Sequence, residues 1–124
     1  MSRLINLTPH EIRILLPQDG PDTSPRYLVL PSAGVARSDS RSQALPPIEV
    51  ADGLGTAVPL SQTTYGAIVG LPDPQPGVVY VTSAIVAEQA QRDDVVAPGT
   101  GPADGAVRED GRVVAVTRLV RVRR

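Results

Sequence analysis

The sequence predicts an α+β fold that is mostly β, an antiparallel or mixed sheet of short strands with one short helix. The core must be built from Val, Ile, Leu and Ala, since Phe, Trp and Cys are absent and only three Tyr are present. Branched aliphatic side chains pack well on a pleated sheet. The 11 Gly and 13 Pro interrupt long helices. A small β-barrel is the alternative architecture.

The length of 124 residues is typical of one domain with one hydrophobic core. Because no segment is long and polar enough to be a linker, we expect residues 1–124 to form a single domain.

The first elements form a hairpin. Ile12–Leu16 is predicted as a strand, residues 18–25 as a turn-rich loop and Arg26–Leu30 as the partner strand. Residues 38–42 alternate Ser and charged residues, so we expect an exposed loop there. Further short strands are expected at residues 35–41, 48–50 and 63–69.

Val78–Val81 is the most strongly β segment, and its apolar character on both faces predicts a central strand covered twice. Ser83 is then the expected N-cap of a helix over Ala84–Gln91, with Ile85, Val86 and Gln89 on its inner side and Glu88 pointing outward. Gly66 and Gly70 suggest a bulge or a close backbone approach.

The C-terminal part begins with a Gly/Pro-rich loop over Asp93–Pro102. The clearest hairpin follows, with Val107–Arg108 and Arg112–Val122 flanking Glu109–Gly111. Alternation of Val with Arg near its end is the pattern of a half-exposed strand.

Composition excludes several chemistries. All twelve basic residues are Arg, so neither a Schiff-base lysine nor a P-loop lysine exists, while Arg suits forked contacts to carboxylate or phosphate. Without Cys there are no disulfides and no thiolate catalysis, which fits a reducing compartment.

Partners are constrained by charge and hydropathy. No run of about 18 apolar residues is present, so no membrane partner is expected, and the first nine residues lack a signal-peptide pattern. A net charge of −1 predicts no bulk nucleic-acid partner. Residues 88–110 hold six carboxylates, whereas residues 112–124 hold five Arg and no acid, an asymmetry typical of interaction with another chain or ligand.

The chain resembles a family of small uncharacterised proteins from bacteriophages, prophages and mobile elements. The segments that carry the resemblance are Asn6–His10, Gly70–Gly77 with Val79–Ala87, Arg92–Val95, Pro98–Pro102 and the hairpin around Gly111. It implies a phage-type accessory protein acting in the host-cell cytoplasm, and it implies no particular activity.

His10, the single histidine, could act as a general base or bind a ligand, because an imidazole pKa of about 6.5 suits proton transfer. The alternative is a structural role in a turn formed by Thr8 and Pro9. Zinc would require several His or Cys ligands, so no metal and no cofactor are expected.

Arg92 is followed by two adjacent carboxylates, Asp93 and Asp94, which could hold a metal or act as acid and base. Consecutive strand residues point to opposite faces, which argues against convergence. The structural interpretation is an Arg at the helix end followed by solvated acids, and Arg92 stays a ligand candidate.

Two other motifs have structural interpretations. The Pro98–Pro102 loop could approach a phosphate through its glycines, but it lacks the Lys of a P-loop and an ordinary turn explains it. Ser83 lacks the Gly-x-Ser-x-Gly pattern of a hydrolase nucleophile.

Tyr residues could stack on a ring while Arg contacts its charge. The ligand-binding candidates are His10, Tyr65, Tyr80, Arg92, Arg108 and Arg112.

Three functions follow from these candidates. The first is a non-catalytic binding protein for a small anionic ligand, possibly a nucleotide signal sequestered against host defence, acting as a homo-oligomer. The second is a structural or protein-interaction module. The third is a small hydrolase using His10 with Asp93 or Asp94.

Overall fold

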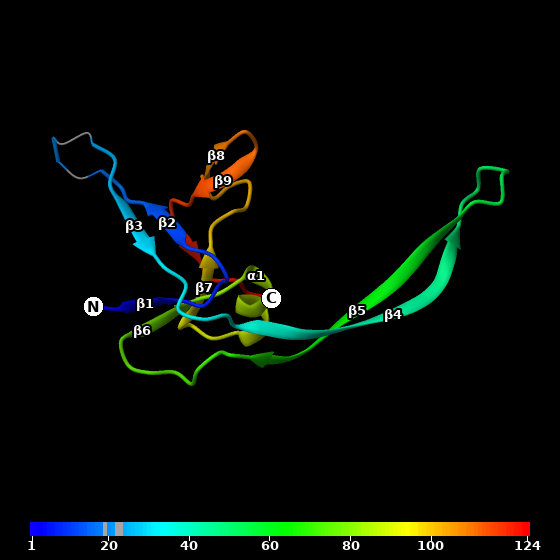
Figure 1. The fold of residues 1–124 in the computed structure, drawn as a ribbon, viewed down its shortest axis with the longest axis horizontal. Helices are drawn as coiled ribbons and strands as arrows, with labels where there is room; N and C mark the ends of the chain where they lie inside the picture. Colours follow the sequence, from blue (N-terminus) through cyan, green and yellow to red (C-terminus); the bar gives the residue numbers. More distant parts are fainter. Residues whose placement is uncertain (19, 22–23) are drawn as a thin grey trace. The chain divides into compact units, whose positions relative to one another are not determined.

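The computed structural model describes residues 1–18, 20–21 and 24–124, which fall into two compact units (Figure 1). The first unit contains residues 1–37 and 68–124, and the second contains residues 38–67. The expected fold class is confirmed: strands in mixed and antiparallel sheets dominate, with one short helix. Over the described residues the sheets are open, so the alternative of a closed barrel is not formed.

A four-stranded mixed sheet organises the first unit. Its strands, in spatial order, are β1 (Arg3–Asn6), β6 (Val78–Val81), β7 (Val95–Pro98) and β10 (Leu119–Val120). The first three strands run parallel, and β10 is antiparallel to β7. The first and the last strand of the chain therefore form the two edges of this sheet.

β6 is the central, doubly covered strand that its sequence predicts. Tyr80 and Val81 are 1% and 0% exposed and point to opposite faces. Tyr80 packs in one cluster with Val86 of the helix, whereas Val81 packs in another with Ile12. Both faces of β6 are therefore core.

The helix α1 (Ala84–Ala90) connects β6 to β7, as a parallel pair requires. The Ser83 side chain accepts a hydrogen bond from the Val86 amide at 3.3 Å, which confirms the predicted N-cap. The helix buries Val86 and Ala87, whereas Ile85 is exposed, contrary to the expectation. Within the described residues, no helix has the length and apolar character needed to cross a membrane.

The N-terminal hairpin is confirmed as β2 (Ile12–Leu15) paired with β3 (Tyr27–Leu30). Ile12 and Ile14 are buried, and the Arg13 guanidinium lies 4.5 Å above the Tyr27 ring on the exposed side. The loop expected over residues 18–25 lies partly outside the described residues.

The C-terminal hairpin is also confirmed, as β8 (Val107–Glu109) and β9 (Arg112–Ala115). The expectation of one strand from 112 to 122 is wrong, because β9 ends at Ala115 and β10 pairs with β7 instead. The expectation of a loop over Asp93–Pro102 is wrong in part, since it contains β7. The strand is short, and the Asp, Pro and Gly residues on either side of it are typical of loops, so the sequence pattern did not indicate it.

The second unit is a β-hairpin of two long strands, β4 (Arg37–Glu49) and β5 (Ala57–Val69), of which residues 37, 68 and 69 are assigned to the first unit. The expectation of a loop over residues 38–42 is wrong, because these residues lie in β4. Their polar character reflects a ribbon that is solvated on both faces. The strands expected at 48–50 and 63–69 are parts of β4 and β5.

Gly70 confirms the expected close backbone approach. Its φ is +87°, and a Cβ atom at this position would lie 2.5 Å from the Val35 carbonyl oxygen. Only glycine fits such a site without displacing the neighbouring backbone.

Candidate functional site

The turn after β1 is organised by Asn6, a buried polar residue that sequence reasoning left without a role. Its side chain is enclosed, with 2% exposure. Nδ2 donates to the carbonyl oxygens of His10 and Leu30 at 2.8 and 2.9 Å, and Oδ1 accepts from the Thr8 amide and hydroxyl at 2.9 and 2.7 Å. The segment 6–10 is therefore a rigid turn built around one amide.

His10 contributes its main-chain oxygen to this turn, and its side chain is exposed. It lies at a hollow of about 310 Å³ between the start of β2 and β9. Arg13 and Thr100 also line this hollow, and Arg108 donates from Nη2 to the Thr100 carbonyl at 3.2 Å. Of the six predicted candidates, His10 lines this hollow, and Arg108 contacts its wall only through the Thr100 carbonyl. Arg112, the first residue of β9, is exposed and is not part of the lining, which includes the next residue, Val113.

Arg92 is committed to internal contacts. Its Nε and Nη2 donate to the two carboxylate oxygens of Asp94 at 2.9 and 2.6 Å, and Nη1 donates to the Pro72 carbonyl at 3.1 Å. This bidentate pair holds the pKa of Asp94 below its ordinary value. Arg92 therefore joins the segment before β6 to the end of α1.

The acids proposed to work with His10 lie at the other end of β7. Asp94 immediately precedes this strand, whereas Pro98 at its end lines the hollow of His10. A rise of about 3.3 Å per residue separates Asp94 from Pro98 by about 13 Å. Asp93 is paired with Arg123. His10 and these acids are not brought within the hydrogen-bond reach of about 3 Å that joint catalysis needs.

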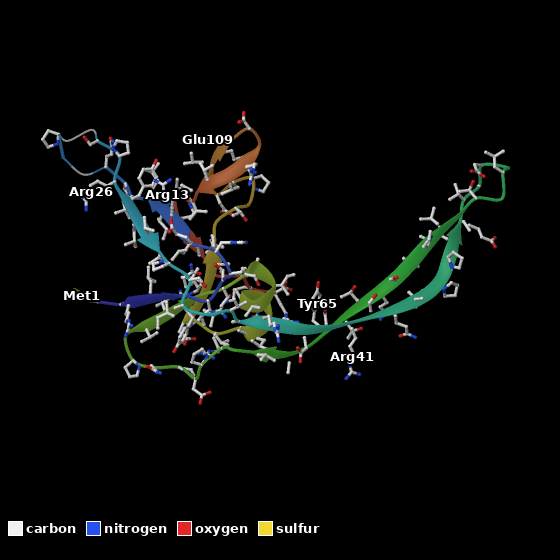
Figure 2. All side chains as sticks on the ribbon, in the orientation of Figure 1. Met1, Arg13, Arg26, Arg41, Tyr65 and Glu109 are labelled. Atoms are coloured by element: carbon white, nitrogen blue, oxygen red, sulfur yellow. The ribbon has the colours of Figure 1, made fainter. Side chains whose placement is uncertain are left out.

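The two candidate tyrosines lie in different units. Tyr80 is core, and its hydroxyl donates to the Asp73 carbonyl at 3.4 Å. Tyr65 is 47% exposed on β5, where it and Arg41 point to opposite sides of the hairpin (Figure 2). Tyr80 is almost fully enclosed in the core, whereas Tyr65 belongs to the separate hairpin unit.

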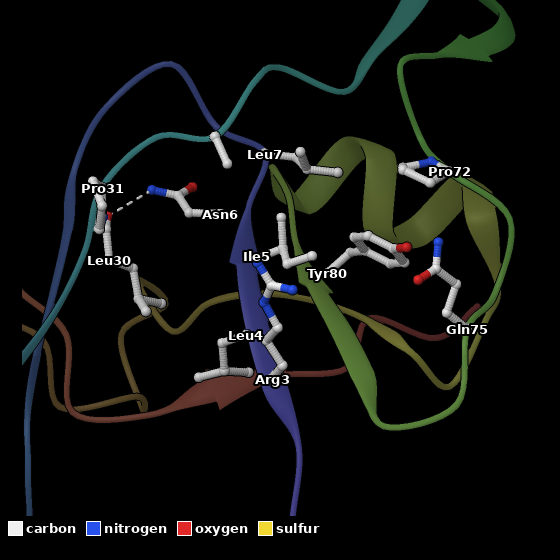
Figure 3. Close-up of a pocket in the computed structure, with 11 residues that line it drawn as sticks. Arg3, Leu4, Ile5, Asn6, Leu7, Leu30, Pro31, Pro72, Gln75 and Tyr80 are labelled. Atoms are coloured by element: carbon white, nitrogen blue, oxygen red, sulfur yellow. Dashed lines mark hydrogen bonds between the residues drawn. The ribbon is translucent and has the colours of Figure 1, made fainter.

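A hollow beside β1 in the first unit was not expected from the sequence. It measures about 460 Å³, and Figure 3 shows Ile5, Leu7 and Tyr80 side by side along it. Most of its wall is apolar, and Arg3 is its single charged lining residue. The wall is formed by Arg3, Leu4, Ile5, Asn6, Leu7, Leu30, Pro31, Ala33, Pro72, Gln75 and Tyr80. The apolar residues of β1 are the signal that could have indicated it.

The hairpin of the second unit exposes apolar side chains. Every residue from 39 to 67 is exposed except the half-buried Leu45. The Val50 amide donates to the Thr56 carbonyl at 2.9 Å, so these residues oppose each other across the ribbon. Because side chains alternate along a strand, Ile48 and Val50 then share one face with Val58 and Leu60. Their exposures are 52%, 42%, 45% and 38%.

The turn at the end of the hairpin is well defined. Asp52 accepts from the Leu54 amide at 2.8 Å and from the Thr56 hydroxyl at 2.5 Å. The Thr56 hydroxyl, followed by the Leu54 amide, holds the pKa of Asp52 below its ordinary value. Leu54 is 84% exposed at the apex, between Gly53 and Gly55.

Among the described residues, no group of three or more His, Cys, Asp or Glu is arranged to hold a metal ion. Comparison with protein-family models, curated proteins and solved structures finds no match.

Proposed function

We propose that this chain is a non-catalytic structural module that assembles with further copies of itself through its hairpin. The observation that carries this proposal is the apolar face formed by Ile48, Val50, Val58 and Leu60 on a ribbon without a core. The proposal agrees with the accessory role implied by the resemblance to small phage and mobile-element proteins.

The physical argument concerns the stability of the ribbon. A two-stranded hairpin in water is marginally stable by itself, and three or more strands or a packed face are usually needed. Exposed contiguous apolar side chains mark interaction surfaces. A second copy that covers this face would supply the missing packing, and the net charge of −1 gives little repulsion between copies.

Sedimentation velocity over a wide range of concentration tests this proposal. We expect the unmodified chain to form oligomers as concentration rises. The variant Ile48→Thr/Val58→Thr, which keeps β-branched side chains but removes apolar surface, should shift the chain toward monomer. Ser61→Ala, on the opposite face, is the matched control. Protection of the Val50 amide from hydrogen exchange checks that the hairpin of each variant is folded.

An unmodified chain that sediments as a monomer at every concentration overturns the proposal. So does a folded Ile48→Thr/Val58→Thr variant that assembles as well as the unmodified chain.

A small anionic ligand, with nucleotides as one class, is the second candidate function. It is favoured by the hollow lined by His10 and Arg13, to which Arg108 is joined through Thr100. The lining holds Arg13 and His10 together with one carboxylate, Glu11, and the Arg108 guanidinium lies beside the Thr100 part of the wall. The two arginines would attract an anion to this hollow. A ligand present at about 100 times its dissociation constant adds about 2.7 kcal/mol to stability.

Thermal unfolding with inorganic phosphate and with a nucleotide panel tests this second candidate. We expect a rise in Tm that is reduced in Arg108→Gln and retained in Arg41→Gln, a hairpin variant. The absence of any rise across the panel removes the candidate.

A further inference from the structure

We propose that the apex of the hairpin of one copy inserts Leu54 into the hollow beside β1 of a second copy. This inference rests on the proposed self-assembly and adds a second contact to the one made by the apolar hairpin face. The apex belongs to the second unit and the hollow to the first. The two surfaces are complementary in apolar character and in charge.

The apex has the properties of an insertion element. Leu54 is 84% exposed, and its neighbours Gly53 and Gly55 carry no side chain, so the apex is narrow with one apolar side chain at its end. The two hydrogen bonds of Asp52 hold the turn in shape. A preorganised turn loses little conformational entropy on binding, which favours association.

The hollow has the properties of a receptor for an apolar side chain. Its volume of about 460 Å³ is lined mainly by aliphatic residues of β1 and of the segment after β3 (Figure 3). Apolar concavities with a few polar groups at their edge are the usual form of binding sites. Moving Leu54 from water into this hollow buries apolar surface that both copies otherwise expose.

Charge complementarity identifies a second copy as the occupant. Between residues 42 and 67 the charged residues are Glu49 and Asp52, both acidic. The hollow has one charged lining residue, Arg3, and no described carboxylate forms an ion pair with it. An acidic apex and a basic rim attract each other as the copies approach.

The contact joins two different surfaces of the chain. Each copy carries one apex and one hollow. Two copies can exchange their apices reciprocally, or a series of copies can be linked head to tail.

Mixing two variants tests the contact. Leu54→Asp damages the apex and leaves the hollow intact, whereas Ala33→Glu places an acid in the hollow and leaves the apex intact. We expect each variant alone to self-associate about 10- to 100-fold more weakly than the unmodified chain, the range expected for losing one buried Leu. An equimolar mixture should regain association, because one intact apex then meets one intact hollow.

Three further variants check the chemistry. Leu54→Met keeps a large apolar side chain and should associate like the unmodified chain. Arg3→Glu should weaken association, and Arg3→Glu combined with Glu49→Arg should restore part of it. Circular dichroism of every variant checks that the fold is retained.

The outcomes separate this inference from the proposed function. If the Leu54→Asp variant assembles as well as the unmodified chain, the apex contact is overturned and the proposed function stands. A folded pair of variants whose mixture stays dissociated also overturns the contact. An unmodified chain that remains monomeric overturns both.

Discussion

Arg92 binds the carboxylate of Asp94 through both of its oxygens, at 2.9 Å from Nε and 2.6 Å from Nη2. The two side chains are 25% and 21% exposed. A planar guanidinium matched to a carboxylate is the strongest geometry for such a pair. Arg92, which the sequence suggested as a ligand donor, therefore stabilises the fold through internal contacts. We expect its removal to lower the free energy of unfolding.

Arg92→Met is expected to lower the free energy of unfolding by about 1–2 kcal/mol, because three charge-assisted hydrogen bonds are lost while the aliphatic stem is kept. Urea denaturation measures this difference. A double-mutant cycle with Asp94→Asn isolates the pair, and a coupling energy indistinguishable from zero would contradict the assignment.

The same pair predicts a dependence of stability on pH. Because Arg92 lowers the pKa of folded Asp94 below its unfolded value of about 3.9, the stabilisation is fully present above that value. It is lost as the pH falls through the folded pKa. The stability difference between the unmodified chain and Arg92→Met should therefore narrow from pH 6 toward pH 2. In an Asp94→Asn background this narrowing should disappear.

Asn6→Ala is expected to cost about 2–4 kcal/mol, since it leaves partners of an enclosed amide without hydrogen bonds. Chemical denaturation measures the loss. His10→Ala is the matched control in the same turn, because the turn uses the main-chain oxygen of His10 and not its imidazole. Equal losses in the two variants would show that the turn does not depend on the Asn6 amide.

Gly70→Ala and Gly20→Ala form a matched pair. Their φ values are +87° and +86°, but a Cβ at Gly70 meets the Val35 carbonyl, whereas nothing lies within 4 Å at Gly20. Both substitutions incur the left-handed penalty of about 1–2 kcal/mol. Gly70→Ala should lose about 1–3 kcal/mol more, because the backbone must move. Similar unfolding free energies for the two variants would contradict the close approach.

The elements that the sequence predicted correctly are those with local signals. The apolar β-branched run of β6, the Ser83 cap and the Asp110–Gly111 turn specify their structures without help from distant residues. Pairing partners were not predictable in this way. The association of β1 with β6 and of β10 with β7 depends on contacts far apart in the sequence.

The long hairpin was missed for a different physical reason. Its strands are solvated on both faces and carry Pro46, Pro47 and Pro59, so they lack the alternation and composition of ordinary strands. The roles of the candidate residues were also not predictable from the sequence alone. Residue type indicated that Arg92 and Tyr80 could bind ligands, but only their surroundings show that one is paired internally and the other is core.

The burial of Tyr80 gives the molecule a natural optical reporter. In a chain without Trp or Phe, three phenol rings supply all the aromatic absorption. Two of them, Tyr27 and Tyr65, are 40% and 47% exposed, whereas Tyr80 is immobilised between the sheet and the helix. The near-ultraviolet circular dichroism of the native state should therefore arise chiefly from Tyr80. The rate at which this signal is lost during unfolding would report the rate at which the interior of the sheet opens.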